Sequence, residues 1–171
     1  MQMVKNIFIG LLLGWFVLLA FMPKQELYYK LEQELEKNDI KINEKRLESG
    51  LFSLTLHESD VYVKGIKLAT VEKVNFFTLL FYTTISMEQL HLDDSLKAML
   101  PTQVDNANIV HAVWKPMSVD ITSEGSFSGL EGMAHLGERT LRLDFNDSNS
   151  ITNLKPQLQE DEKGWYYETS F

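Results

Sequence analysis

The sequence contains no cysteine, so disulfide bonds, thiol catalysis, cysteine-type zinc sites and lipoprotein acylation are excluded. Basic residues are also few, since 16 Lys and Arg stand against 24 Asp and Glu and the formal net charge is −8. Nucleic-acid binding requires a basic face, so no nucleic-acid partner is expected. A hydrophobic share of 44% with 23% charged residues excludes wholesale disorder. The length of 171 residues indicates one domain with an appendage.

A long hydrophobic run lies near the N-terminus, from Ile7 to Met22, and contains no charged residue. As a helix it would be roughly 24 Å long, close to the hydrocarbon thickness of a bilayer. Lys5 and Lys24 flank the run and can reach the two membrane surfaces. We therefore predict that residues 1–23 form a transmembrane anchor. A cleaved signal peptide and a buried helix of a soluble protein stay open as alternatives, although the run has no A-x-A cleavage motif.

The expected orientation of this anchor rests on size, because the basic residues on its two sides are nearly balanced. The short segment before the run is expected to stay in the cytoplasm, so the larger part of the chain is expected to be exported across the membrane. That part contains all the acidic residues, which disfavours docking on an anionic membrane surface except close to the anchor.

Residues 24–38 have the pattern of an amphipathic helix that follows the membrane. Leu27, Leu31 and Leu35 recur at four-residue spacing, and Glu26 with Lys30 forms a favourable pair at the same spacing. Such a helix either covers one end of a sheet or touches lipid or a partner helix. The three leucines are therefore candidate contact residues.

From residue 40 onward the hydrophobic period changes to two, as in Leu54 and Leu56 between Thr55 and His57. Further alternating runs lie at residues 40–43, 61–68, 71–76, 85–92, 109–114, 117–121, 141–145 and 165–169. Short alternating strands at this density predict a mainly β domain over residues 39–171. We expect a curved antiparallel sheet with one apolar face, packed by the amphipathic helix.

The segment at residues 76–82, FFTLLFY, departs from this alternation because it is apolar on both faces. It is either a short helix or a doubly buried strand, and it is expected to cover the core. Its candidate contact residues for a partner or lipid are Phe76, Phe77, Leu80 and Phe81. Farther on, residues 93–100 have the pattern of a capped helix that ends at Pro101, and residues 102–108 are expected to form a loop.

Residues able to carry out chemistry are scattered. The four histidines each lie in a different segment with no second ligand at metal-binding spacing: His57, His91, His111 and His135. Asp93 and Asp94 are interpreted as helix caps. No nucleophile elbow, phosphate-binding loop or dinucleotide fingerprint is present in the sequence. We predict a protein that is not an enzyme, with no catalytic residue, cofactor or metal.

The order of these features resembles a known family. An F-x-P step at residues 21–23 leads into the amphipathic helix, followed by a Gly-led alternating strand at residues 50–56. Then come VEKVNFFTLLFYTTISMEQLHLDD, residues 71–94, and a glycine-punctuated region at residues 125–137. Together these features resemble the type II secretion system protein N family and, more distantly, the N-terminal modules of AsmA-like membrane proteins.

The resemblance covers roughly residues 7 to 145 and implies a bacterial inner-membrane protein whose main domain is periplasmic. Its first implied function is an accessory subunit of a type II secretion or pilus-like system, with other secretion-system or envelope proteins as partners. The alternative is a lipid-handling module of the cell envelope, as in AsmA-like and lipopolysaccharide-export proteins. An open apolar groove favours lipid binding, whereas a covered apolar face favours the subunit.

Overall fold

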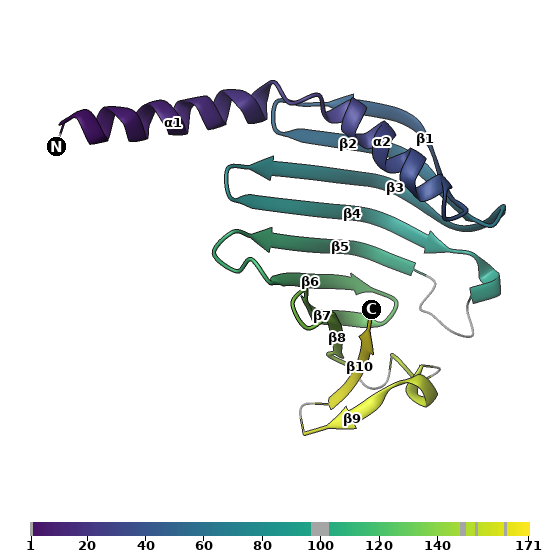
Figure 1. Cartoon of the computed structure of the whole chain (residues 1–171). Coiled ribbons are helices and arrows are strands. Elements are labelled where there is room, and N and C mark those ends of the chain that lie inside the picture. The colour runs from purple at the N-terminus through teal and green to yellow at the C-terminus, as the bar shows by residue number, and fades with distance from the viewer. Residues whose placement is uncertain (1, 97–102, 148–149, 153, 163) are drawn as a thin grey trace.

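The computed structural model describes residues 2–96, 103–147, 150–152, 154–162 and 164–171, which form two α-helices followed by one sheet (Figure 1). The helices are α1 (Gln2–Ala20) and α2 (Lys24–Glu36), and two short 3-10 helices are η1 (Asp94–Leu96) and η2 (Lys155–Gln157). The strands are β1 (Ile40–Ser49), β2 (Ser53–Val63), β3 (Ile66–Leu79), β4 (Tyr82–Leu92), β5 (Gln103–Ala112), β6 (Ser118–Gly125), β7 (Ser128–His135), β8 (Thr140–Phe145), β9 (Gln159–Asp161) and β10 (Gly164–Ser170).

The strands form a single antiparallel sheet in which β1 to β7 each pair with the next strand in sequence. At the C-terminal side β10 lies between β8 and β9, so β1 and β9 are the two edges. The sheet is curved and open (Figure 1). The predicted mainly β fold behind a long apolar N-terminal helix is thereby confirmed.

One face of the sheet is apolar across nearly its whole width. Residues paired directly in antiparallel strands share a face, so the register identifies rows of neighbouring side chains. One such row consists of Leu54, Phe76, Ile85, Ile109, Ile121, Gly132, Leu143 and Tyr167. The row beside it consists of Leu47, Leu56, Val74, Met87, Ala107, Ser123, Leu130, Phe145 and Trp165. We call this side of the sheet the apolar face.

Two residues with left-handed backbone reset the alternation partway along the strands. Glu58 in β2 has a φ of 48° and Gln89 in β4 has a φ of 50°. Strict alternation after Leu56 would turn Glu58 toward the apolar face. Instead the next buried position is Ser59, which is 2% exposed and pairs with Val71, itself 3% exposed. In each of these strands the apolar alternation before the left-handed residue is out of phase with the alternation after it. The change in backbone direction at that residue keeps both parts apolar on the same face of the sheet.

Three local expectations fail in instructive ways. Residues 76–82 are not a helix: residues 76–79 are strand, as the other alternative expected, but half-buried, and the chain then turns at Leu80 and Phe81 and begins β4, so the segment does not cover the core. Residues 103–108 are not a loop but the first half of β5. Of the helix expected at residues 93–100, the structure has the single turn η1, and residues 97–100 lie outside the described part of the chain.

The helix α2 lies along β1 and β2 on the apolar face and is fixed there by Tyr28 (Figure 1). The Tyr28 side chain is 4% exposed and packs on Leu54 and Leu56. Its hydroxyl donates a 2.9 Å hydrogen bond to Glu44 Oε2 on β1. In contrast, Leu31 is 48% exposed, so the leucines do not form the main contact with the sheet.

Candidate functional site

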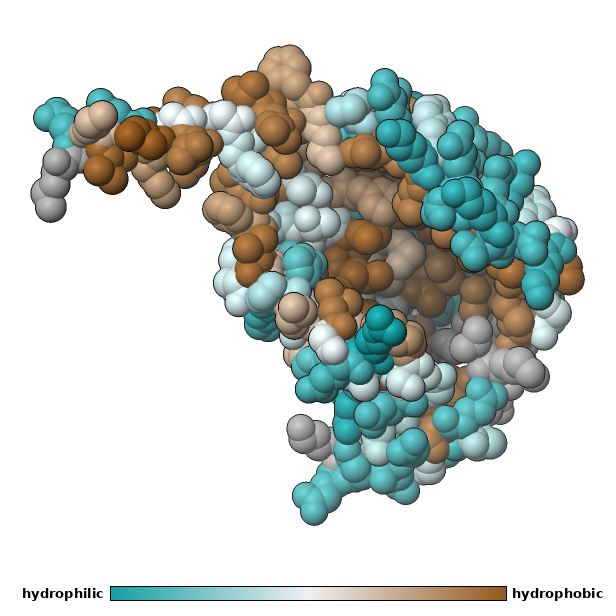
Figure 2. Space-filling view, in the orientation of Figure 1, coloured by the Kyte–Doolittle hydropathy of each residue, from teal (hydrophilic) through white to brown (hydrophobic). Residues whose placement is uncertain are grey.

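The strongest candidate for a functional site is the uncovered middle of the apolar face. The helix α2 lies over the first strands, and Figure 2 shows a hollow lined with apolar residues between this helix and the C-terminal strands. In this middle part the side chains are only half-buried and belong to neither of the two buried clusters of the sheet. We call the four residues Ile85, Met87, Ile109 and Ile121 the apolar floor.

A buried cluster borders this floor on each side. On the side of α2, Tyr28 joins Leu54 and Leu56. On the C-terminal side, Phe127, Ile151 and Leu154 are each at most 8% exposed. Partly buried residues of β7, β8 and β10 pack against this second cluster, among them Leu130, Phe145 and Trp165. The floor therefore lies between two packed walls, each with its own hydrophobic core.

The floor continues into a cavity of about 200 Å³ where α1, α2 and the sheet meet. The cavity is lined by Leu19 and Met22 near the end of α1, by Lys24, Leu27, Tyr28 and Leu31 of α2, and by Phe52, Leu54, Phe76 and Thr78 of the sheet region. Phe76 is the direct cross-strand partner of Ile85, the first residue of the floor in this row. An apolar surface thus runs from the end of α1 to the centre of the sheet.

Two contacts hold α1 against this cavity. The Phe16 and Phe52 rings lie with their centroids 5.0 Å apart, and Lys24 Nζ donates a 3.4 Å hydrogen bond to the Leu19 carbonyl. A lysine near a helix C-terminus interacts favourably with the unpaired carbonyl groups there. The end of the exposed apolar helix α1 is therefore fixed at the mouth of the cavity.

Electrostatics around α2 follow from its close approach to β1. Burial and the hydrogen bond to Glu44 raise the pKa of the Tyr28 hydroxyl far above its ordinary value. Burial, followed by the nearby Glu44 and Glu36 carboxylates, raises the pKa of Glu32. Glu32 thus lies on the side of α2 that approaches β1, near Glu44, and Lys24 is the charged residue among those that line the cavity.

The candidate contact residues from the sequence are only partly brought together. Leu27, Leu31 and Phe76 line the cavity, while Leu35 is half-buried one turn farther along α2. Phe77 follows Phe76 in β3 and therefore points to the opposite face of the sheet. Leu80 and Phe81 form the turn between β3 and β4, and Phe81 is 51% exposed.

Tyr28, Phe52 and the apolar floor were missed as site residues. The alternating runs that contain Ile85, Met87, Ile109 and Ile121 could have identified the floor residues as one face of a sheet. The pattern does not say which part of that face is left uncovered. Helical spacing gives no signal for Tyr28, because two of the half-buried residues that share its side of α2, Lys24 and Glu32, are charged.

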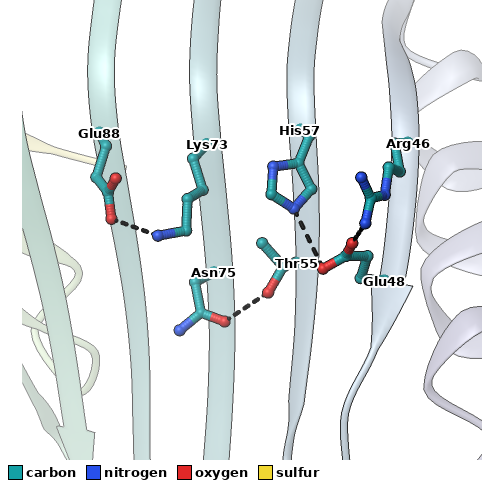
Figure 3. A network of polar contacts seen from close by, with 7 residues as sticks. All are labelled: Arg46, Glu48, Thr55, His57, Lys73, Asn75 and Glu88. Atoms are coloured by element: carbon teal, nitrogen blue, oxygen red, sulfur yellow. Dashed lines mark hydrogen bonds and ion pairs between the residues drawn. The ribbon is translucent and has the colours of Figure 1, made fainter.

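The other face of the sheet carries polar pairs rather than a site (Figure 3). Glu48 pairs with Arg46 and lies 3.5 Å from His57 Nε2, and Lys73 Nζ donates to Glu88 Oε1 at 2.8 Å. Hydrogen bonds between side chains of neighbouring strands, such as Thr55 to Asn75 at 3.0 Å, continue the pattern. Exposed pairs of this kind contribute little to stability and leave the face solvated.

Among the described residues, no group of three or more His, Asp or Glu side chains is arranged to hold a metal ion. Comparison with known proteins adds no assignment, because no family model, curated protein or solved structure matches this chain. The candidate site is consequently defined by its own geometry. We call the apolar floor, the cavity and the two walls beside them the trough, and the apolar helix α1 lies next to it.

Proposed function

We propose that this protein is a membrane-anchored carrier that holds an acyl chain of a membrane lipid along its apolar floor. The observation that carries the proposal is that apolar surface continues from the end of α1, through the cavity, to a half-buried floor that neither α2 nor the C-terminal cluster covers. A contiguous apolar surface that is left open often marks the binding site of a ligand or partner.

The chemistry of the trough favours an acyl chain over a polar ligand. The residues of the floor are isoleucine and methionine, and the cavity is lined by leucine, methionine and aromatic side chains together with Thr78 and the charged Lys24. The cavity of about 200 Å³ is smaller than a typical small-molecule pocket, so it suits one end of a flexible chain that lies along the floor. The negative net charge of the protein gives an anionic head group little attraction.

The properties of α1 favour a membrane anchor, which would place the trough beside the bilayer that supplies the lipid. It is the helix of the described chain that is long and apolar enough to span a bilayer. Most of its large side chains are exposed, as Phe8 at 65% and Leu11 at 69% illustrate, so α1 is not a core helix within this chain. Its contacts with Phe52 and Lys24 favour retention over cleavage, because cleavage after Ala20 would remove Leu19 from the cavity wall.

The secretion-subunit hypothesis stays a prediction of the resemblance, together with the bacterial inner membrane and the periplasm as its setting. It expects contacts through α2 or a sheet edge. Strand β1 carries charged residues along its length, and β9 consists of three exposed residues, two of them acidic. Both features oppose the addition of a partner strand. Co-purification of secretion-system proteins with the full chain is the test of that hypothesis.

Adjacent residues of β5 allow a sharp test of lipid binding. Ile109 belongs to the apolar floor, and the half-buried Val110 points to the opposite face, where its partners are Thr84 and Asp120. A photoreactive phenylalanine analogue is placed at either position in the full chain, and membranes are irradiated before purification and mass spectrometry. We expect lipid adducts at position 109 and none at position 110. Absence of lipid at 109, or equal labelling at both positions, contradicts the proposal.

A further inference from the structure

The turns at one end of the sheet carry exposed apolar side chains. In an antiparallel meander every second turn emerges at the same end, so the turns after β1, β3, β5 and β7 lie together, and the residue after β10 joins them. We call the following residues, each between 44% and 70% exposed, the apolar rim: Leu51, Phe81, Val113, Trp114, Met117, Leu136 and Phe171.

Backbone hydrogen bonds tie these turns into one continuous surface. The Val113 amide donates to the Phe81 carbonyl at 2.9 Å, and the Leu136 amide donates to the Met117 carbonyl at 2.9 Å. The Phe171 amide donates in the same way to the carbonyl of Arg139, in the turn after β7, at 2.9 Å. The turns that carry the rim therefore form one hydrogen-bonded row and not a set of unrelated loops.

The opposite end of the sheet differs in the described part of its turns. Lys64 and Gly65 form the turn after β2, and Ser95 is exposed in the connection after β4. The turn after β6 has an apolar residue, Phe127, but this side chain is 3% exposed because it packs into the C-terminal cluster. Ile66 is the exception at this end, at 63% exposed. Exposed apolar turns are thus concentrated at the rim end.

The helix α1 leaves the domain at this same end. Its ring contact joins Phe16 to Phe52, which follows the rim residue Leu51, and the Thr78 amide near the β3 turn donates to the Phe52 carbonyl at 2.9 Å. Figure 1 shows α1 extending away from the sheet on the side where the β3–β4 and β5–β6 turns lie. If α1 crosses a bilayer, the rim faces that bilayer.

We propose that the apolar rim inserts into the interfacial region of the membrane that α1 spans, so that the sheet stands on the lipid surface and the trough opens there. Trp and other aromatic side chains favour this depth of a bilayer. Attraction is apolar rather than electrostatic, because the turn after β7 has Glu138 beside Arg139, and Lys115 is paired with Asp120 at 3.2 Å. The proposal rests on the membrane anchor of the proposed function but not on lipid binding in the trough.

The chain has no cysteine, so single cysteines report on chosen positions without background. Trp114→Cys and Leu136→Cys report on the rim, and Leu11→Cys reports on α1. Ile66→Cys is the matched control, since Ile66 is 63% exposed at the other end of the sheet. Each full-chain variant is labelled with an environment-sensitive fluorophore and reconstituted in vesicles of phosphatidylethanolamine and phosphatidylglycerol containing an acyl-chain spin-labelled lipid.

We expect blue-shifted emission and at least twofold quenching by the spin label at positions 114, 136 and 11, with water-like emission and no quenching at position 66. Quenching at 11 together with rim labels that behave like position 66 overturns the rim proposal and leaves the anchor intact. Blue-shifted rim labels without quenching indicate burial against a second protein surface and also overturn it. No quenching at 11 overturns the anchor and the rim proposal with it.

Discussion

Tyr28 of α2 and Glu44 of β1 are joined by a 2.9 Å hydrogen bond at the point where the helix meets the sheet. Tyr28 is only 4% exposed and its ring packs on Leu54 and Leu56. One side chain therefore supplies both an apolar and a polar contact between α2 and the sheet. Placement of α2 determines one wall of the trough, because Leu27 and Leu31 line the cavity only while the helix keeps this position.

Removal of the Tyr28 side chain is expected to be the most damaging single change in α2. Tyr28→Ala should lower the free energy of unfolding by about 3–5 kcal/mol through lost burial, and Tyr28→Phe by about 1 kcal/mol through the lost hydrogen bond. Chemical denaturation of the full chain in detergent measures both. Tyr29→Ala is the matched control, since Tyr29 is 48% exposed and its loss should cost under about 0.5 kcal/mol.

The pKa of Glu32 is raised by burial and by Glu44, so the folded protein binds this proton more tightly than the unfolded chain does. Above that raised pKa the ionised carboxylate lowers stability. Glu32→Gln should therefore stabilise the protein at neutral pH by about 0.3–0.5 kcal/mol, the scale of exposed charge pairs. The gain should vanish as the pH falls below the usual carboxyl range, where the residue is protonated in both states.

The control for this change is Glu26→Gln. Glu26 lies in the first turn of α2, where a negative charge interacts favourably with the helix dipole. Its neutralisation should lower the free energy of unfolding at neutral pH, opposite in sign to the effect at Glu32. Equal effects of the two changes would show that general charge reduction, not the local field around Glu44, is responsible.

Gly132 is a point of close approach within the apolar rows. A Cβ at this position would lie 2.5 Å from Leu143 Cδ2 and 2.8 Å from the Arg142 carbonyl oxygen. Gly132→Ala is expected to lower the free energy of unfolding by roughly 1–3 kcal/mol, because backbone in the neighbouring strand must move. Gly137→Ala serves as the control, since its Cβ would meet only Met117 Sδ, at 3.9 Å. Thermal unfolding of both variants would reveal the difference.

The N-terminal helix is expected to be retained and the domain exported. The protein extracted from membranes should have the mass of a chain that keeps residues 1–22, and a reporter fused after Phe171 should be active in the periplasm and not in the cytoplasm. An N-terminus that begins after Ala20 would establish a cleaved signal peptide. A reporter active only in the cytoplasm would establish the opposite orientation.

Alternation in the sequence was sufficient for the class of fold but not for the phase of the strands. The alternating runs around Leu54 and Val61 are out of phase in the sequence, yet both belong to β2. Glu58 lies between them and has a left-handed backbone conformation, which brings the two runs to the same face. Glutamate is not a residue type that favours this conformation, so the reset has no local signal. Residues 103–108 were missed as strand for a similar reason, since their last four residues, DNAN, have low β propensity and are held by pairing with β4 and β6.

The candidate site was less predictable than the fold. Leucine spacing in α2 suggested Leu31 as the contact with the sheet, whereas the side of the helix that contains Tyr28 is buried. A tyrosine can turn to the sheet because Glu44 accepts a hydrogen bond from its hydroxyl group, and Glu44 is distant in sequence. Likewise, the density of apolar residues at 76–82 indicated a core, but Phe81 lies at a turn and is exposed. Which apolar residues stay uncovered depends on where the turns between strands lie. The hydrophobic periodicity of the sequence does not give the positions of these turns.

The strand order also has a consequence for how the protein folds. Because β2 to β8 each pair with the preceding strand, β2 can join β1 before β3 is available, and a chain delivered from its N-terminal end can grow its sheet one hairpin at a time. Every intermediate in such growth has an unpaired strand at its advancing edge, where other chains can attach. This edge becomes blunt only when the hairpin of β9 and β10 docks on β8. Docking of the β9–β10 hairpin would thus protect a nascent molecule from aggregation through this edge.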